Sequence, residues 1–298
     1  MRPVTSAVKR TRALTGSLAV VAAAVACALP ASAATTPAAT PATTPAAAPG
    51  ATTPADSPAI SPPHTTTPAA TPAAPSKATI WVNKHTVSVG GQYLINPDGF
   101  RESMTLANVG YGNNFTVATN TPVRGKVLAF PDFLFGCSWG VCSPHRTLPV
   151  QISRDGDPGA SVSTAGNPKG EYNAAYDIWL ELKPYLSGQP HGAEIMIWPR
   201  ETANVGSLRG LPEVRIDGAL YWEIEWRASN SHGSWNYVQF RKVSQSNSLR
   251  GIHLNDFFKA AEARGWVSPR WYIQSITAGF EIWSGGRGLQ MSRFWVRS

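Results

Sequence analysis

The feature that most constrains this chain is a short apolar segment with a carboxylate in its interior. Residues 193–198 read Ala-Glu-Ile-Met-Ile-Trp and lie between a glycine and a proline. This composition predicts a strand that is buried on both faces. Because side chains alternate along a strand, Glu194, Met196 and Trp198 share one face, and the opposite face is plain core. A carboxylate buried there is costly, so it is either paired structurally or placed for chemistry.

A second segment repeats this arrangement. Residues 279–283 form another apolar run with Glu281 in the middle and Trp283 two positions later, on the same face. Sugar rings stack their C–H faces on indoles, and cleavage of a glycosidic bond needs one carboxylate as nucleophile or base and another as proton donor. The two segments together favour a polysaccharide hydrolase over a purely structural use of the acids.

Three segments in series resemble glycoside hydrolase family 12, the small β-jelly-roll endoglucanases and xyloglucanases. They are 172–180 (Tyr-Asn-Ala-Ala-Tyr-Asp-Ile-Trp-Leu), 194–198 and 278–283. Their order and spacing also agree, and the resemblance covers residues 135–296. It implies an all-β jelly-roll sandwich of two antiparallel sheets, with one short helix packed on the back.

The resemblance also implies roles for three carboxyl groups. Glu194 corresponds to the nucleophile, Glu281 to the general acid/base, and Asp177 to a residue that hydrogen-bonds and orients the nucleophile. Two neighbouring carboxyl groups cannot both ionise cheaply, so one holds a proton and positions the other. A retaining mechanism requires the two glutamate carboxyl groups about 5–5.5 Å apart, on neighbouring strands.

Further side chains are expected in the substrate cleft. Trp198, Trp179 and Trp283 are candidate stacking platforms, with core packing as the alternative for each, and we expect at least one of the three to be core. Met196 is expected beside the nucleophile, and Asn173 shares a face with Asp177. Family members usually have Asn-Asn-x-Trp-Gly near the start of the domain; residues 96–100 read Asn-Pro-Asp-Gly-Phe instead, which places Phe100 as the substitute for a cleft tryptophan.

The cysteines predict one disulfide. Cys27 falls in the expected export signal, which leaves Cys137 and Cys142 as a close pair whose simplest interpretation in an exported protein is a bridge closing a tight loop. A zinc site is the weaker alternative, because no CxxC partner or histidine pair lies nearby. The family pattern around this pair agrees with the bridge.

Composition divides the chain into three parts. Residues 1–33 have a basic start, an apolar centre and an Ala-Ser-Ala site, as a secretory signal peptide does. Residues 34–77 are almost wholly Ala, Thr, Pro and Ser, which predicts a disordered linker, and 78–298 hold all the tryptophans and form the catalytic domain. We expect a secreted, extracellular protein; a lipid anchor on Cys27 is the alternative.

Charge and motifs limit the partners. The formal net charge is +8, and +4 without the four basic residues of the signal, with Lys and Arg scattered rather than clustered. This argues against a nucleic-acid partner. No membrane span, metal or other cofactor is implied, and a monomer acting on a β-glucan polysaccharide is expected. The favoured function is a secreted, retaining endo-β-1,4-glucan hydrolase; the alternatives are a non-catalytic carbohydrate-binding jelly roll and a xyloglucan-specific hydrolase of the same family.

Several local elements are also predicted. Short alternating runs at 79–82, 93–95 and 115–117 indicate strands of an antiparallel sandwich, and Asp-Gly at 217–218 indicates a hairpin. Residues 137–150 are expected to be a loop. The alternation around Glu223 and Glu225 is typical of a solvent-facing strand, and a helix is expected over 255–264, capped by Asn255.

Overall fold

The computed structural model describes residues 79–82, 87–109, 114–144, 147–154, 158–184, 187–202, 208 and 210–297. All of them lie in one compact unit, Ala69–Ser298. The expected signal peptide (1–33) and linker (34–77) lie outside the described residues.

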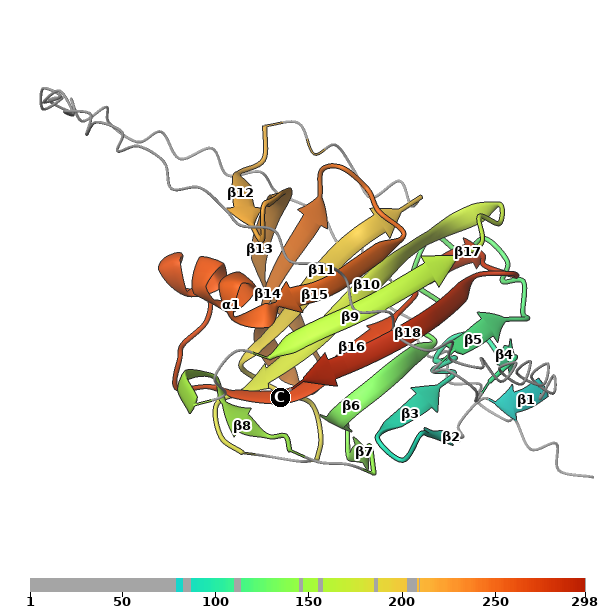
Figure 1. Cartoon of the computed structure of the whole chain (residues 1–298), viewed down its shortest axis with the longest axis horizontal. Coiled ribbons are helices and arrows are strands. Elements are labelled where there is room, and N and C mark those ends of the chain that lie inside the picture. Colours follow the sequence, from blue (N-terminus) through green and yellow to red (C-terminus); the bar gives the residue numbers. More distant parts are fainter. Residues whose placement is uncertain are drawn as a thin grey trace, which may run out of the picture. The chain divides into compact units, whose positions relative to one another are not determined.

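Two stacked β-sheets form the described unit (Figure 1). The main path of the larger sheet runs β12 (Glu213–Ile216), β13 (Ala219–Asn230), β14 (Gly233–Lys242), β11 (Ala193–Glu201), β10 (Gly170–Glu181), β16 (Tyr272–Gly279), β6 (Asp132–Ser138), β3 (Tyr93–Asn96) and β2 (Val87–Val89). Three short strands pair beside this path: β17 (Ile282–Gly285) with β10, β7 (Val141–Cys142) with β6, and β8 (Val150–Gln151) with β16. The smaller sheet runs β1 (Thr79–Val82), β4 (Met104–Ala107), β5 (Asn114–Val117), β18 (Gln290–Arg297), β9 (Gly159–Ala165) and β15 (Ser248–His253).

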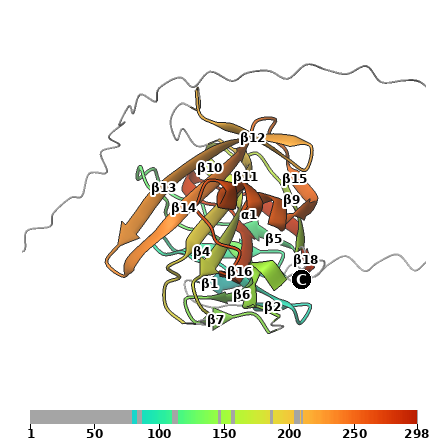
Figure 2. The ribbon, with the colours of Figure 1, turned by 90° about the vertical axis from the view of Figure 1, so that its left-hand side faces the viewer.

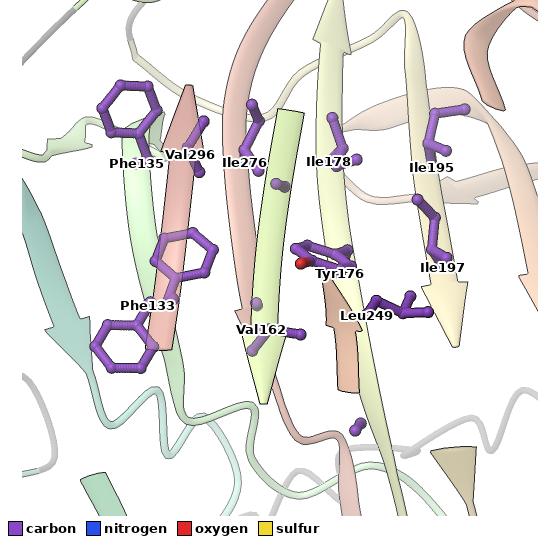
Figure 3. Packing of buried hydrophobic residues seen from close by; sticks show 14 of the residues in the cluster. Phe133, Phe135, Val162, Tyr176, Ile178, Ile195, Ile197, Leu249, Ile276 and Val296 are labelled. Carbon is purple, nitrogen blue, oxygen red and sulfur yellow. The ribbon is translucent and has the colours of Figure 1, made fainter. Parts of the chain in front are cut away.

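The main core lies between the two sheets. Alternation, interrupted by a β-bulge in β16, sends side chains of β6, β10, β11 and β16 toward the smaller sheet, where they meet Val162, Leu249 and Val296 (Figure 3). The residues that the larger sheet contributes there include Phe133, Phe135, Tyr176, Ile178, Ile195, Ile197 and Ile276. Burying each such side chain contributes roughly 1.5–3 kcal/mol. One face of the larger sheet is therefore fixed as core, and the other face is left for function.

The helix α1 (Leu254–Ala263) packs against the core side of the larger sheet (Figure 2), as the resemblance predicts. Its aromatic contacts are made by Phe257 to Tyr221 of β13 and Phe240 of β14. The helix begins one residue earlier than predicted, and its N-cap is His253 rather than Asn255. The earlier start buries Leu254 completely, with its backbone N–H donating to Pro158 O at 2.9 Å.

The sandwich class is confirmed, with two local differences. The pair β11 and β14 is parallel, because the chain leaves β11, forms the antiparallel β12–β13 pair and returns along β14 in the direction of β11. Residues 137–142, expected to begin a loop, instead form the β6–β7 hairpin. Its two turn residues are Trp139 and Gly140, both with positive φ, and the predicted disulfide between Cys137 and Cys142 closes it.

The prediction that Glu223 faces solvent on β13 is wrong. This residue is 2% exposed, and its Oε2 lies 2.9 Å from Arg264 Nε, just after α1. Glu223 pairs in register with Phe240 of the core, whereas Trp226 on the opposite face is 43% exposed. The predicted alternation of β13 is correct. The buried face is the one with Glu223, because α1, which comes later in the chain, covers it.

Candidate active site

Glu281 is held in place by a single asparagine. Asn173 begins the cleft face of β10, and its Nδ2 donates to Glu281 Oε2 at 2.5 Å. Its Oδ1 accepts the backbone N–H of Glu281 at 2.9 Å, and its own N–H donates to Glu281 O at 3.0 Å. Since Asn173 is completely buried, this three-point contact fixes both the backbone and the carboxyl group of Glu281.

Glu194 is oriented by an indole from another strand. Trp235 on β14 donates its Nε1–H to Glu194 Oε2 at 2.6 Å. Because β11 and β14 are parallel, Glu194 pairs in register with Tyr237, and Trp235 lies two residues earlier on the same face. The bond leaves the second carboxyl oxygen of Glu194 available to the cleft.

Asp177 lies between the two glutamates. It is on β10, paired in register with Met196 of β11 on one side and Thr277 of β16 on the other. Glu194 is therefore its diagonal neighbour on β11, and Glu281 follows the end of β16. Asp177 Oδ2 accepts a hydrogen bond from Trp179 Nε1 at 3.1 Å. No donor among the described residues reaches its Oδ1.

Burial raises the pKa of all three carboxyl groups. The pKa of Glu281 rises to about 7, an effect that the hydrogen bond from Asn173 opposes. Burial, followed by the charge of Glu281, raises the pKa of Asp177 to about 8. The pKa of Glu194 also lies above its usual range through burial and then the Asp177 charge, while the bond from Trp235 lowers it. At neutral pH the cluster therefore retains protons, which a proton-donating mechanism requires.

These carboxyl groups open into a cleft of about 810 Å³. Its lining comes from one strand after another across the larger sheet, so the cleft crosses the strands rather than following them. The lining residues are Asn96, Asp98, Phe100, Val127, Phe130, Asp132, Leu134, Ser138, Trp139, Val141, Asp177, Trp179, Glu194, Met196, Asn230, Trp235, Thr277 and Glu281.

Aromatic rings form one wall of the cleft. Trp179 lies between Trp139, at 4.8 Å between ring centroids, and Trp235, at 5.5 Å. Strand register also places Trp179, Glu194, Tyr237 and Trp226 in one row across β10, β11, β14 and β13. Exposed aromatic edges and faces beside carboxylates suit a carbohydrate ligand, because pyranose rings have apolar C–H faces and polar rims.

The structure divides the predicted cleft residues into two groups. Trp179, Met196 and Phe100 line the cleft, and Phe100 is 50% exposed. Trp198 and Trp283 do not: Trp198 is 4% exposed, packed edge-on against Trp283 and beneath the Arg241 guanidinium. Core packing, the alternative given above for each tryptophan, therefore describes Trp198. Asn173 also lies outside the lining and contacts Glu281 instead of the cleft.

Sequence reasoning missed several lining residues. Trp139 falls in the predicted loop at 137–150, and nothing in the sequence around Trp139 or Trp235 indicates that either reaches the cleft. Asp132 could have been found, because it begins the apolar run Asp-Phe-Leu-Phe and obeys the same rule that singled out Glu194. Across the described part of the chain, no cluster of three or more His, Cys, Asp or Glu side chains could hold a metal ion, and no helix is long and apolar enough to span a membrane.

Known proteins of one family resemble the chain over this region. Residues 138–297 match glycosyl hydrolase family 12. Endoglucanase S of Pectobacterium parmentieri is 29% identical over 178 residues, which are 57% of this chain and 66% of that protein. The chain thus spans slightly less than two thirds of that relative. A probable cellulase, Cel12b of Mycobacterium tuberculosis, is 27% identical over 151 residues, 49% of this chain and 94% of that protein.

Solved structures agree with these sequence relatives. Endoglucanase cel12A from Rhodothermus marinus has a TM-score of 0.66 at 30% identity, covering 74% of this chain and 97% of that one. The family 12 xyloglucanase from Bacillus licheniformis shares the fold, with a TM-score of 0.66 at 23% identity over 74% of this chain and 98% of that one. The matched residues include β10 with Asp177, β11 with Glu194, and Glu281 between β16 and β17, and the chain belongs to glycosyl hydrolase family 12.

Proposed function

We propose that this protein is a secreted, retaining endo-β-1,4-glucan hydrolase that cleaves β-glucan by double displacement. The observation that carries the proposal is the pair of glutamates in one cleft, each held by a different neutral donor. Trp235 holds Glu194 and Asn173 holds Glu281, so each carboxyl group has its own orientation and its own pKa. A binding protein would not need two buried acids fixed in this way.

In the first step Glu281 acts as the acid. With its pKa raised to about 7, it is protonated at mildly acidic pH and gives its proton to the leaving glycosidic oxygen. Glu194 attacks the anomeric carbon, the C–O bond to the leaving chain breaks, and a glycosyl ester forms on Glu194. Asp177, whose pKa is about 8, remains protonated beside Glu194 and limits the repulsion between neighbouring carboxylates.

In the second step Glu281 acts as the base. Now ionised, it accepts a proton from a water molecule while the water oxygen attacks the anomeric carbon. The ester bond to Glu194 breaks, and Glu281 is again protonated. Both bonds form and break on the cleft side, where Trp179 and Met196 border the reacting centre.

The substrate class is proposed from the relatives and from the lining. The named relatives above 25% identity are endoglucanases or cellulases, which favours unbranched β-1,4-linked or mixed-linkage glucan. The cleft lining comes from several neighbouring strands of the larger sheet, which suits an extended polymer chain. Export is proposed from the signal-like residues 1–33, and a mass measurement of the exported chain would distinguish cleavage after residue 33 from acylation of Cys27.

The test is reducing-sugar release from barley β-glucan, carboxymethylcellulose and xyloglucan by the chain lacking residues 1–33. Glu194→Gln and Glu281→Gln should each lower kcat by about 10³-fold or more. Glu213→Gln, an exposed glutamate on β12, is the matched control and should retain full activity. If the unmutated chain bound these glucans without cleaving them, the protein would be a carbohydrate-binding jelly roll instead.

A further inference from the structure

Two carboxyl groups of the cleft have no part in the proposed reaction. Asp98 lies just beyond β3, and Asp132 begins β6; both line the same cavity as the catalytic acids. In the strand register Asp132 is paired with Asn96 on β3 and with Gly279 on β16. Both acids therefore belong to the end of the cleft that is farthest from β13 and β14.

Asp132 is buried without a partner for one of its oxygens. It is 3% exposed, and among the described residues no donor lies within hydrogen-bonding distance of its Oδ1. Burial first, and then the charges of Asp98 and Asp177, raise its pKa well above the usual range. A polar group in this condition destabilises the fold, so its presence in the cleft wall is better explained by a ligand that completes its hydrogen bonds.

The residues beside Asp132 on β16 and β10 have little or no side chain. Gly279 approaches so closely that a Cβ there would lie 2.8 Å from Asp132 Cβ and 3.0 Å from Phe130 Cε2. The next residue in the same row is Ala175 on β10. Asp132 thus packs closely beside two positions with little or no side chain, and it reaches the cleft as one of the lining residues.

An apolar ring borders the same end of the cleft. Phe100 is 50% exposed and lies two residues after Asp98, and Phe130, although buried, also lines the cleft. A pyranose presents an apolar C–H face and a rim of hydroxyl groups, so an exposed aromatic ring next to two carboxyl groups matches both parts of it. A hydroxyl group both donates and accepts, and a carboxyl group that can hold a proton offers the same two roles.

We propose that Asp132 and Asp98, together with Phe100, form a hydroxyl-binding subsite for a neutral glucosyl unit, separate from the catalytic centre. The proposal rests on the glucan hydrolase function above and specifies one sugar position of it. The charge of the cleft determines which sugar is accepted. Its lining contains five carboxyl groups and no lysine, arginine or histidine, so a neutral glucosyl unit is favoured over an anionic one.

Binding to an inactive chain tests the subsite without hydrolysis. In a Glu194→Gln background, isothermal titration with cellohexaose should show that Asp132→Ala weakens binding about tenfold or more, the loss expected when a hydrogen bond to a carboxyl group is removed. Asp256→Ala, an exposed aspartate on α1, is the control and should bind like the background. Asp132→Asn keeps the shape of the side chain, so an intermediate loss with an unchanged thermal midpoint would exclude misfolding as the cause.

Kinetics on two polymers provide a readout that a purely structural role would not change. In the active chain at pH 8, Asp98→Asn should raise the ratio of kcat/KM on carboxymethylcellulose to that on barley β-glucan, because the pKa of Asp98 is raised only to about 6 and the change removes a negative charge that repels the carboxymethyl groups. Asp132→Asn should leave this ratio unchanged, because burial raises the pKa of Asp132 well above the usual range and keeps it protonated. Asp256→Asn should leave the ratio unchanged.

The outcomes separate the subsite from the hydrolase. If the chain cleaves glucan but Asp132→Ala binds cellohexaose as tightly as the control, the subsite is overturned and the proposed function stands. If Asp132→Asn lowers kcat with cellohexaose affinity unchanged, the residue acts on the catalytic carboxyl groups, and the subsite is overturned as well. If the unmutated chain cleaves nothing while Asp132→Ala still weakens binding, the subsite stands in a binding protein.

Discussion

At the scale of single residues, the contact between Asn173 and Glu281 predicts a pH effect. The hydrogen bond from Asn173 lowers the pKa of Glu281 against the larger effect of burial. In the unmutated chain kcat/KM should fall as Glu281 loses its proton above about pH 7. Removing the donor with Asn173→Ala raises this pKa, so the alkaline limb should move to higher pH by about one unit, with a lower maximum.

Profiles of kcat/KM between pH 4 and pH 10 measure this shift when the apparent pKa of the alkaline limb is fitted for each variant. An alkaline limb that stays in place in Asn173→Ala would assign it to another group, of which Asp177 with a pKa of about 8 is the first candidate.

The bond from Trp235 to Glu194 predicts a loss of rate rather than of binding. Trp235→Phe keeps the aromatic ring in the wall and removes only the Nε1–H donor. We expect kcat to fall about tenfold to a hundredfold, because the nucleophile loses its orientation and its pKa rises, with little change in KM. Trp295→Phe, an exposed tryptophan of β18, is the matched control. A rise in KM with kcat unchanged would show that the indole binds sugar instead.

A functional residue could be predicted from the sequence when its role is visible in its own segment, and not when the role depends on a distant strand. Glu194 and Glu281 could be chosen because a carboxylate inside an apolar run is visible in the sequence itself, and Asp132 satisfies the same test. The role of Asp177 came from the family resemblance. The contact from Trp235 could not be predicted, because it depends on β14 returning parallel to β11. Trp198 resembled a cleft residue by alternation, and only the packing of Trp283 and Arg241 shows it to be buried.

At the scale of elements, the pair Glu223 and Arg264 joins β13 to the end of α1. Arg264→Leu would leave a buried carboxyl group without its cation and should lower the free energy of unfolding by about 2–4 kcal/mol at pH 8. The pKa of Glu223 is raised to about 7 by burial, and Arg264 lowers it. The group is therefore mostly neutral at pH 5, where losing the cation matters less, so the loss of stability should grow as pH rises through 7.

Urea unfolding at pH 5 and pH 8 measures this difference, with Lys259→Leu on the exposed side of α1 as the control. Equal losses at the two pH values would mean that the Arg264 side chain stabilises the fold by packing and not by its charge.

Whether a hairpin could be predicted from the sequence depended on its turn residues. The hairpin at Asp217 and Gly218 is confirmed, because both residues adopt the positive φ that Asp-Gly accommodates well. The hairpin at Trp139 and Gly140 was not predicted, because tryptophan is unusual at positive φ. The predicted disulfide between Cys137 and Cys142 is equally compatible with a loop and with a hairpin. The burial of Glu223 was missed because α1 follows it in the chain.

At the scale of the whole molecule, the fold should not need the residues before the domain. A chain that begins at residue 77 should keep its thermal midpoint and stay within about twofold of the activity of the chain that begins at residue 34. A start at residue 87 removes β1, which pairs with β4 at the edge of the smaller sheet, and should lower the midpoint by roughly 2–4 °C. Thermal unfolding and β-glucan hydrolysis of the three chains measure both effects. A loss of structure on starting at residue 77 would contradict this boundary.

The strand order of the sheets could not be derived from local patterns. Alternation indicates strands and their buried faces, but pairings such as β5 with β18 join segments from opposite ends of the domain. The resemblance to a known family predicted the jelly-roll class, without the order of its strands. The candidate catalytic residues were easier to predict than the strand order, because they lie in three short segments of the sequence.

The strands that hold Trp179, Glu194, Tyr237 and Trp226 are spaced at about the length of a sugar unit. Each residue of the row belongs to a different strand, and neighbouring strands lie about 4.8 Å apart, close to the length of one glucosyl unit in a β-1,4 chain. A glycan laid across the sheet meets a new strand with nearly every sugar. The number of neighbouring strands that line the cleft would then set how many sugars the protein contacts at once.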